Sequence, residues 1–183
     1  MRTIRRALVF LLCSALLLPA QGNTFKRVRY NGGTVGTKTK PDDWGNTLTV
    51  TSGSIHLLLK DGQEINIAPK SVTSLSYGQE AHRRVGTMVA LAILVSPVAL
   101  VGLVHKTREH FIGMQYSEGD NKSGLLLQGD KDNYRAILVA LQSVTGQSVA
   151  VSEKERESVP VGITTEATKE TAAGPKGAPA AAK

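Results

Sequence analysis

Alternating apolar and polar residues mark a series of short strands in the first half of the chain. Between Thr47 and Ile67, three runs (TLTVT, SIHLLLK and EINI) place leucine, isoleucine or valine at every second position, which is the spacing of half-buried strands. Asp61-Gly62, between the second and third runs, is a strong β-hairpin turn. A fourth run, Val72–Tyr77, alternates with one irregularity. Short strands joined by tight turns predict an antiparallel meander rather than βαβ units.

Strand patterns also lie on both sides of this meander. Phe25–Tyr30 alternates upstream, and Glu109–Tyr116 and Ser123–Gln128 resume the pattern downstream. In the first of the downstream strands, Phe111 is expected to share one face with Gly113 and Gln115. The opposite face would then carry Ile112, Met114 and Tyr116.

The clearest helical pattern follows Asp130. Five apolar residues recur at helical spacing and form one stripe: Tyr134, Ile137, Leu138, Leu141 and Val144. Asp130 is predicted to cap the start of this helix and Gly146 to end it. Residues 148–151 (SVAV) predict a short last strand. The mixed charges and the Ala/Gly/Pro-rich end of residues 152–183 predict a disordered tail.

One long apolar stretch interrupts the strand patterns. Val85–Val104 contains twenty consecutive uncharged residues, flanked by Arg83-Arg84 and by His105-Lys106-Thr107-Arg108. At about 1.5 Å rise per residue it is long enough for one crossing of a bilayer core of roughly 30 Å. Its relation to the strands on either side therefore decides the architecture.

Residues 1–22 have the pattern of an export signal. Three arginines form a basic start, Ala7–Leu18 is an apolar stretch of the usual length, and small residues follow. The single cysteine, Cys13, lies inside the apolar stretch without small residues before it, which does not fit a lipoprotein signal. We expect export to the cell envelope, with an uncleaved N-terminal anchor as the alternative.

Charge and composition narrow the function further. The net charge is +7, and removing the three signal arginines leaves 19 basic against 15 acidic residues, or about +4. Aromatic residues make up only 4% of the chain, so the interleaved basic and aromatic side chains of a nucleic-acid interface are not expected. Without the signal the chain has no cysteine, which excludes disulfides and thiolate metal sites.

No set of residues for catalysis or metal binding can be named. The sequence contains neither G-x-S-x-G nor H-E-x-x-H. His82, His105 and His110 flank the apolar stretch, but zinc would need further ligands at a defined spacing. Gly32–Lys40 (GGTVGTKTK) lacks the spacing of a phosphate loop and is expected to be an exposed loop. Trp44, which follows it, is expected to plug one end of the fold.

The run LTVTSGSIHLLLKDGQEINIAPKSVTSLSY resembles the GRAM branch of the pleckstrin-homology (PH)-like superfamily. The positions that fit the pattern are Leu48, Thr51, Ile55, Ile67, Pro69 and Val72. The segments HFIGMQY to LQSVTG fit the last strands and the capping helix of that fold. The resemblance covers Phe25–Val151 and extends to exported bacterial proteins of the same layout, which carry no assigned activity.

This resemblance implies a mainly β (α+β) fold. We expect an antiparallel barrel of about seven strands with a C-terminal capping helix over residues 23–151, interrupted by a hydrophobic insert at 78–108. If both flanks belong to one barrel, the insert must return to the side it left, because a single crossing would separate the strands and expose their edges. Ser96-Pro97 offers the bend for a helical hairpin whose arms each enter one leaflet. A true membrane span, and a soluble packing or oligomer-forming element, remain alternatives.

The hairpin interpretation names two groups of residues. Those predicted to enter the membrane are Val85, Met88, Leu91, Leu94, Pro97, Leu100 and Leu103. Those predicted to meet anionic headgroups are Arg83, Arg84, Lys106 and Arg108. The predicted function is a non-enzymatic, membrane-associated binding or scaffold module of the cell envelope that needs no cofactor or metal. Membrane lipid is the expected partner, with a protein partner or homo-oligomer as a further one. The alternatives are an oligomeric assembly protein and a single-span membrane protein.

Overall fold

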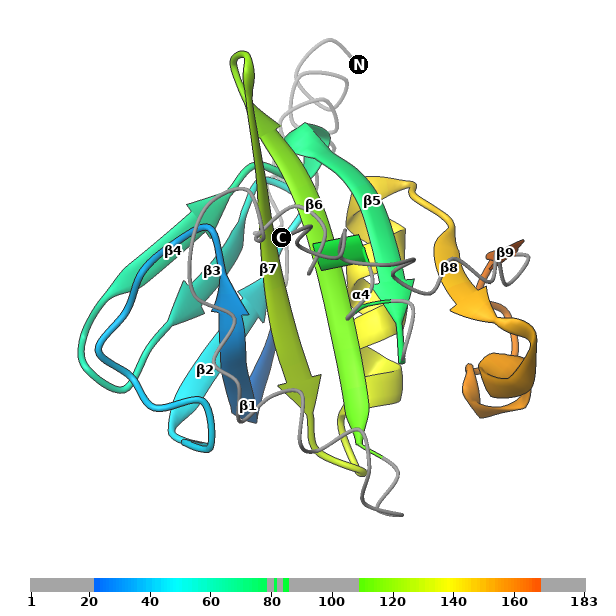
Figure 1. The fold of residues 1–183 in the computed structure, drawn as a ribbon, viewed down its shortest axis with the longest axis horizontal. Helices are drawn as coiled ribbons and strands as arrows, with labels where there is room; N and C mark the ends of the chain where they lie inside the picture. The colour runs from blue at the N-terminus through cyan, green and yellow to red at the C-terminus, as the bar shows by residue number, and fades with distance from the viewer. Residues whose placement is uncertain (1–21, 79–80, 82–83, 86–108, 169–183) are drawn as a thin grey trace, which may run out of the picture.

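The computed structural model of the chain describes residues 22–78, 81, 84–85 and 109–168 (Figure 1). Within these residues, the strands form one nine-stranded sheet with a single long helix against it. The elements are β1 (Asn23–Gly33), β2 (Asn46–Val50), β3 (Ile55–Leu58), β4 (Glu64–Ile67), the 3₁₀ turn η1 (Pro69–Ser71), β5 (Val72–Tyr77), β6 (His110–Glu118), β7 (Asn121–Gly129), α4 (Tyr134–Thr145), β8 (Val149–Ser152), the 3₁₀ turn η2 (Glu153–Ser158) and β9 (Thr165–Thr168).

The first strand joins the two parts of the sheet. The strand order is β4-β3-β2-β1-β7-β6-β5-β8-β9. The first half of β1 pairs with β2 and its second half with β7, and Val28 lies in both ladders. A bulge between Phe25 and Val28 lets the strand turn from one partner to the other. At this bulge Arg27 has a φ of 58°, the left-handed region that non-glycine residues rarely adopt.

The predicted order of elements is present, but the expected closed barrel is wrong. The meander, the two later strands and the C-terminal helix follow one another as the PH-like resemblance implies. The sheet, however, is open, with β4 and β9 at its two edges. The physical reason is that β8 pairs in parallel with β5. The edge of β5 that would have to meet β4 is therefore already occupied.

The main core lies between the inner face of the sheet and α4. The predicted apolar stripe is confirmed, since Ile137, Leu138 and Leu141 are fully buried. Gly146 ends the helix in the left-handed conformation, with a φ of 69°. The prediction that Asp130 caps the helix is wrong, because α4 begins later, after Asn133. Asp130 Oδ1 accepts the backbone N–H of Asp132 at 3.0 Å and so stabilises the turn before the helix.

Both faces of β6 and β7 are buried. Ile112 and Leu127 face the main core, whereas Phe111 and Leu126 form a second cluster with Ala81 and Val85. The opposite placement of Phe111 and Ile112 is the one that the sequence predicts. The uninterrupted run Leu125–Leu127 agrees with this arrangement, because a strand buried on both faces needs no polar alternation.

The C-terminal segment is more ordered than its composition suggests. Disorder is the expectation from residue 152 onward, whereas η2 follows β8 directly and β9 comes after a further turn. The open edge of β8 supplies the reason, since β9 pairs with it in parallel from Val149↔Thr165 to Ser152↔Thr168. Residues 169–183 lie outside the described part of the chain.

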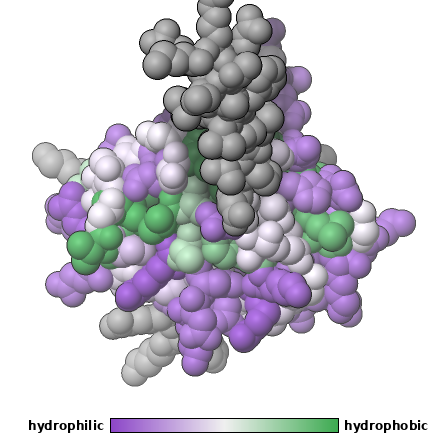
Figure 2. All heavy atoms as spheres, turned by 180° about the vertical axis from the view of Figure 1, so that it is seen from behind, coloured by the Kyte–Doolittle hydropathy of each residue, from purple (hydrophilic) through white to green (hydrophobic). Residues whose placement is uncertain are grey.

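On the side opposite to the view of Figure 1, hydrophilic residues predominate in the part drawn in colour, with smaller separate hydrophobic areas between them (Figure 2). The large hydrophobic side chains exposed in the described regions are Leu58, Val139 and Val161. They come from β3, α4 and the loop before β9, so they are scattered rather than gathered into one patch. Scattered apolar residues of this kind are ordinary on a protein surface.

Two predicted features lie largely outside the described residues. These are the export signal, of which Gly22 alone is described, and most of the insert, including residues 86–108. In the part of the chain that the structure describes, no helix has the length and apolar character needed to cross a membrane.

Candidate functional site

The two ends of the insert meet at one point of the sheet. Strands β5 and β6 are antiparallel neighbours, with Tyr77 opposite Ile112. One residue further on, the backbone N–H of Gly78 donates to the carbonyl of Phe111 at 2.9 Å. The chain therefore leaves the sheet and rejoins it at the same place. We call Tyr77, Gly78, His110 and Phe111 the insert base.

Three stacked rings hold the insert base against the helix. The rings of His110 and Tyr134 are almost parallel, at 2°, with centroids 3.6 Å apart. The Tyr77 hydroxyl and His110 Nδ1 share a hydrogen bond of 2.7 Å. Burial raises the pKa of the Tyr77 phenol above its ordinary value, so this group remains a neutral hydroxyl at physiological pH.

Tyr134 also connects the ring stack to the C-terminal segment. The Tyr134 hydroxyl donates to the carbonyl of Ser158 at 3.2 Å and accepts from Arg135 Nε at 2.8 Å. That second bond raises the pKa of Arg135 further above its already high value. The Glu155 carboxylate packs against Gly78. Insert base, helix start and η2 thus converge on one cluster.

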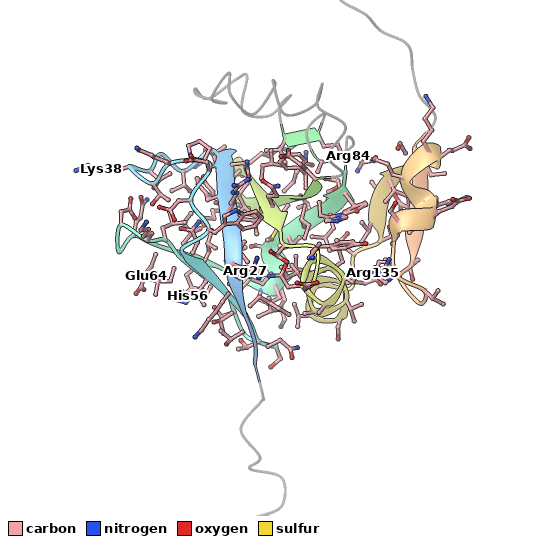
Figure 3. All side chains as sticks on the ribbon, turned by 90° about the horizontal axis from the view of Figure 1, so that it is seen from below. Arg27, Lys38, His56, Glu64, Arg84 and Arg135 are labelled. Carbon is pink, nitrogen blue, oxygen red and sulfur yellow. The ribbon has the colours of Figure 1, made fainter. Side chains whose placement is uncertain are left out.

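On the other face of the sheet, the first helical turn of the insert is seated in a defined way. Arg84 Nη1 donates to Ser74 Oγ at 3.0 Å, and Gln115 Nε2 donates to the carbonyl of Arg84 at 3.1 Å. Gly113 allows this close approach, because a Cβ there would lie 3.0 Å from Ala81 Cα. Figure 3 places Arg84 and Arg135 on opposite sides of the β5–β6 region. We call this cluster the insert seat. It comprises Ala81, Arg84 and Val85 of the insert and the sheet residues that they contact, Ser74, Phe111, Gly113, Gln115 and Leu126.

Two of the residues predicted to contact the membrane or its headgroups, Arg84 and Val85, are among those that the structure describes. Val85 is 2% exposed and packs on Phe111 and Leu126, and the Arg84 guanidinium binds Ser74. The other predicted membrane residues, Met88, Leu91, Leu94, Pro97, Leu100 and Leu103, lie outside the described residues. So do the other predicted headgroup residues, Arg83, Lys106 and Arg108. Membrane contact by either group stays a prediction.

Of the three histidines that flank the apolar stretch, His110 is the one that the structure describes. His110 is committed to the ring stack, and His82 and His105 lie outside the described residues. Over residues 22–78, 81, 84–85 and 109–168, no group of three potential metal-binding side chains occurs.

The glycine- and lysine-rich loop forms a shallow hollow instead of a phosphate loop. Gly36, Thr37 and Lys38 line an open space of about 490 Å³ with Asp61 and Gln63. The Asp61 carboxylate accepts the hydroxyl of Thr37 and the backbone N–H groups of Lys38 and Gln63. These bonds, led by the Gln63 N–H, lower the pKa of Asp61. The loop is thereby tied to the β3–β4 turn, and its backbone donors are directed to a protein carboxylate.

Trp44 packs beside Arg29 rather than inside the core. The Arg29 guanidinium lies 4.1 Å from the centre of the indole ring, within the range of a cation–π interaction. Arg29 also donates to the carbonyl of Asp42 at 3.0 Å and to Gln128 Oε1 at 3.2 Å. The half-buried tryptophan therefore fixes the loop before β2 against β1 and β7.

Sequence reasoning missed the ring stack and the insert seat. Tyr77 ends β5 and His110 begins β6, just outside the two ends of the insert, so pairing of these flanking strands would have predicted that they meet. Tyr134 carried no such indication, because its contact with His110 depends on where α4 packs.

Comparison with known proteins gives only distant similarity. No model of a known protein family matches the sequence. No curated protein matches it either. Among solved structures, the chain is similar to the Spt16D–Pob3N heterodimer structure at 4% identity and a TM-score of 0.43, over 85% of this chain and 60% of that one. It is also similar to the C-terminal phosphotyrosine interaction domain of mouse APBB2 at 11% identity and a TM-score of 0.44, over 71% of this chain and 90% of that one.

Proposed function

We propose that the chain is a non-enzymatic binding module held at a membrane of the bacterial cell envelope by its insert, Gly78–Arg108. The observation that carries this proposal is the hydrogen bond between Gly78 and Phe111 across the insert base. A segment that starts and ends at one point leaves the whole sheet on one side of any membrane that it enters.

The composition of the insert supports a lipid partner. Val85–Val104 is uncharged, and basic residues stand on both of its flanks. Basic side chains near an anionic membrane surface contribute about 1 kcal/mol each. We assign this role mainly to Arg83, Lys106 and Arg108, since Arg84 Nη1 is already bonded to Ser74.

Vesicle flotation tests the proposal. The full chain should float with vesicles of mixed anionic and neutral lipid, and less with neutral vesicles alone. The double variant Leu91→Glu/Leu94→Glu should lose most of this binding, because charged side chains are expensive in hydrocarbon. Leu58→Glu is the matched control, since Leu58 is already 39% exposed on β3 and far from the insert in sequence. Equal flotation of both variants would contradict the membrane role.

A second variant separates the insert from the fold. Because Gly78 and Phe111 are already hydrogen-bonded, a short turn can replace the insert without moving β5 or β6. The shortened chain should stay folded and stop floating with vesicles. Loss of the folded state would instead mean that the sheet depends on the contacts of Ala81 and Val85 with Phe111 and Leu126.

The alternative is an assembly protein whose inserts pack on one another. The uncharged stretch Val85–Val104 is the feature that supports it, because an apolar surface of this length can be buried against other copies as well as in lipid. Size measurements in detergent and in detergent-free buffer discriminate the two functions. An oligomer of the same size under both conditions, lost on replacing the insert, would support assembly.

The compartment is a proposal that rests on residues 1–22 alone. If the chain is exported through this segment, the chain recovered from the envelope fraction should begin near Asn23. N-terminal sequencing of the chain recovered from that fraction checks it. A chain that still begins at Met1 would favour the uncleaved anchor.

A further inference from the structure

The segment Ile163–Thr168, which we call the strap, lies along the edge of β8 and against α4. The Gln142 side chain forms two hydrogen bonds with the backbone of Thr164. Its Nε2 donates to the Thr164 carbonyl at 3.0 Å, and its Oε1 accepts the Thr164 N–H at 3.2 Å. The same carbonyl accepts the N–H of Val149 at 2.9 Å. Ser148 Oγ donates to Glu166 Oε1 at 2.6 Å. The strap is thus recognised as an extended chain, mostly through its main chain.

Little apolar burial holds the strap in place. Glu166 and Ala167 are exposed, and Ile163 is only partly buried against the core. A segment with few buried apolar contacts and solvent-exposed backbone hydrogen bonds opens at low free energy. The strap is therefore a part of the fold that can detach while the main core stays intact.

The link before the strap has the features of a hinge. A tight turn over Pro160–Ile163 is closed by a single long hydrogen bond of 3.3 Å, from the Ile163 N–H to the Pro160 carbonyl. Gly162 has a φ of 96°, which side-chain-bearing residues rarely adopt. Val161 is fully exposed at the tip. Glycine adopts this φ without strain, whereas any side chain would strain the turn, and short hinge turns under strain favour exchange of the following element between chains.

We propose that the surface covered by the strap, namely the edge of β8 with Gln142 of α4 beside it, is an interaction surface for a second copy of this chain, which binds there with its own Ile163–Thr168. We call this surface the groove. When the strap leaves, β8 presents an unpaired edge that an extended chain can cover. The structure shows that the strap sequence pairs with this edge, and a second copy of the chain carries the same sequence. Exchange of identical elements keeps every contact and alters only the hinge. The proposal does not depend on membrane binding.

Cross-linking between two differently tagged chains tests it. Both full-length chains carry Cys13→Ser, which removes the single cysteine. One chain carries Ser148→Cys and the other Glu166→Cys, because these side chains touch across the groove. After mixing in detergent, a short bis-maleimide should join the two tags severalfold more than in the control mixture. The control replaces Ser148→Cys by Ser52→Cys, at the exposed β2–β3 turn.

Two further measurements show whether the groove is responsible. Gly162→Ala should raise the yield of cross-linked dimer, because the tight turn is strained by a side chain while an extended hinge is not. Excess peptide PVGITTEAT should lower the yield by competing for the groove. Cross-linking at the control level for both the parent and the Gly162→Ala chains would overturn the proposal. Dimer yield that is unchanged by the peptide would overturn it as well.

Discussion

Replacing Gly113 by alanine tests the insert seat directly. A Cβ at this position would lie 2.5 Å from Ser76 Oγ, 3.0 Å from Ala81 Cα and 3.1 Å from Ala81 Cβ. A Cβ 2.5 Å from an oxygen is a clash, and 3.0–3.1 Å from carbon is tighter than nearly all Cβ contacts, so either the sheet or the helical turn of the insert must give way. The Ser76 hydroxyl can rotate away, whereas Ala81 can yield only if its backbone shifts.

The expected size follows from two opposing effects. Overpacking a well-packed site costs about 1–3 kcal/mol. Changing glycine to alanine in a compatible backbone gains about 0.4–1 kcal/mol by restricting the unfolded chain. The net loss for Gly113→Ala should therefore be about 1–2 kcal/mol. In a domain of this size each kcal/mol lowers Tm by about 2–4 °C.

Chemical denaturation and brief trypsin digestion together make the assay. Denaturation gives the free energy of unfolding, and cleavage after Arg84 reports whether the insert seat has opened. Gly53→Ala is the control, since a Cβ at that exposed turn meets no atom within 4 Å. Adding Ala81→Gly to Gly113→Ala should recover more stability than adding Ser76→Gly. If Gly113→Ala matches Gly53→Ala in both stability and cleavage, Ala81 does not rest on the sheet.

Three further changes address other parts of the fold. The N–H of Asp132, and then Arg27, lower the pKa of Asp130. The stability that this group contributes is present above the unfolded pKa of about 3.9 and is lost as pH falls through the lower folded value. Asp130→Asn should therefore reduce the loss of the free energy of unfolding with falling pH in this range, as measured by denaturation at a series of pH values. Arg29→Ala should cost about 0.5–1 kcal/mol in cation–π energy and shift the fluorescence of Trp44, the single tryptophan; an unchanged spectrum would contradict the stacking. Tyr77→Phe removes the hydroxyl bonded to His110 and should cost about 1 kcal/mol, whereas Thr73→Val on the exposed side of β5 should be nearly neutral; equal effects would contradict a special role for the ring stack.

Local pattern was sufficient for most individual elements. Alternation identified β2, β3 and β4, Asp61-Gly62 marked their hairpin, and helical spacing found the buried stripe of α4. These features depend on residues close in sequence, where periodicity and turn chemistry act directly. The single irregularity expected in Val72–Tyr77 is the register shift between Val72 and Ser74.

The pairing at the open end of the sheet could not be predicted from local pattern. The sequence TEAT has no apolar alternation, yet it forms β9 because the edge of β8 is available. Likewise, Asp130 looked like a helix cap, but its carboxylate is used by the turn to Asp132. Both outcomes depend on which partner is free in three dimensions. Propensity and spacing do not contain that information.

The candidate site shows the same division. That the insert must return to its starting point followed from the strands on either side of it. The contacts that hold it there, His110 on Tyr134 and Arg84 on Ser74, join elements that are adjacent only after folding. The sequence therefore indicated where the site is, and tertiary packing on the two faces of the sheet determined how it is built.

The position of β1 has a consequence for the order in which the chain folds. Its N-terminal half completes the β2–β4 hairpins, which can form from local contacts. Its C-terminal half needs β7, and the hydrogen-bonded side chains of Arg29 and Gln128 are 99 positions apart. Bringing such distant segments together is slow, because the entropy of closing the intervening loop is lost before the pairing compensates for it. The two parts of the sheet can therefore assemble separately, and their union through β1 is expected to be the rate-limiting step of folding.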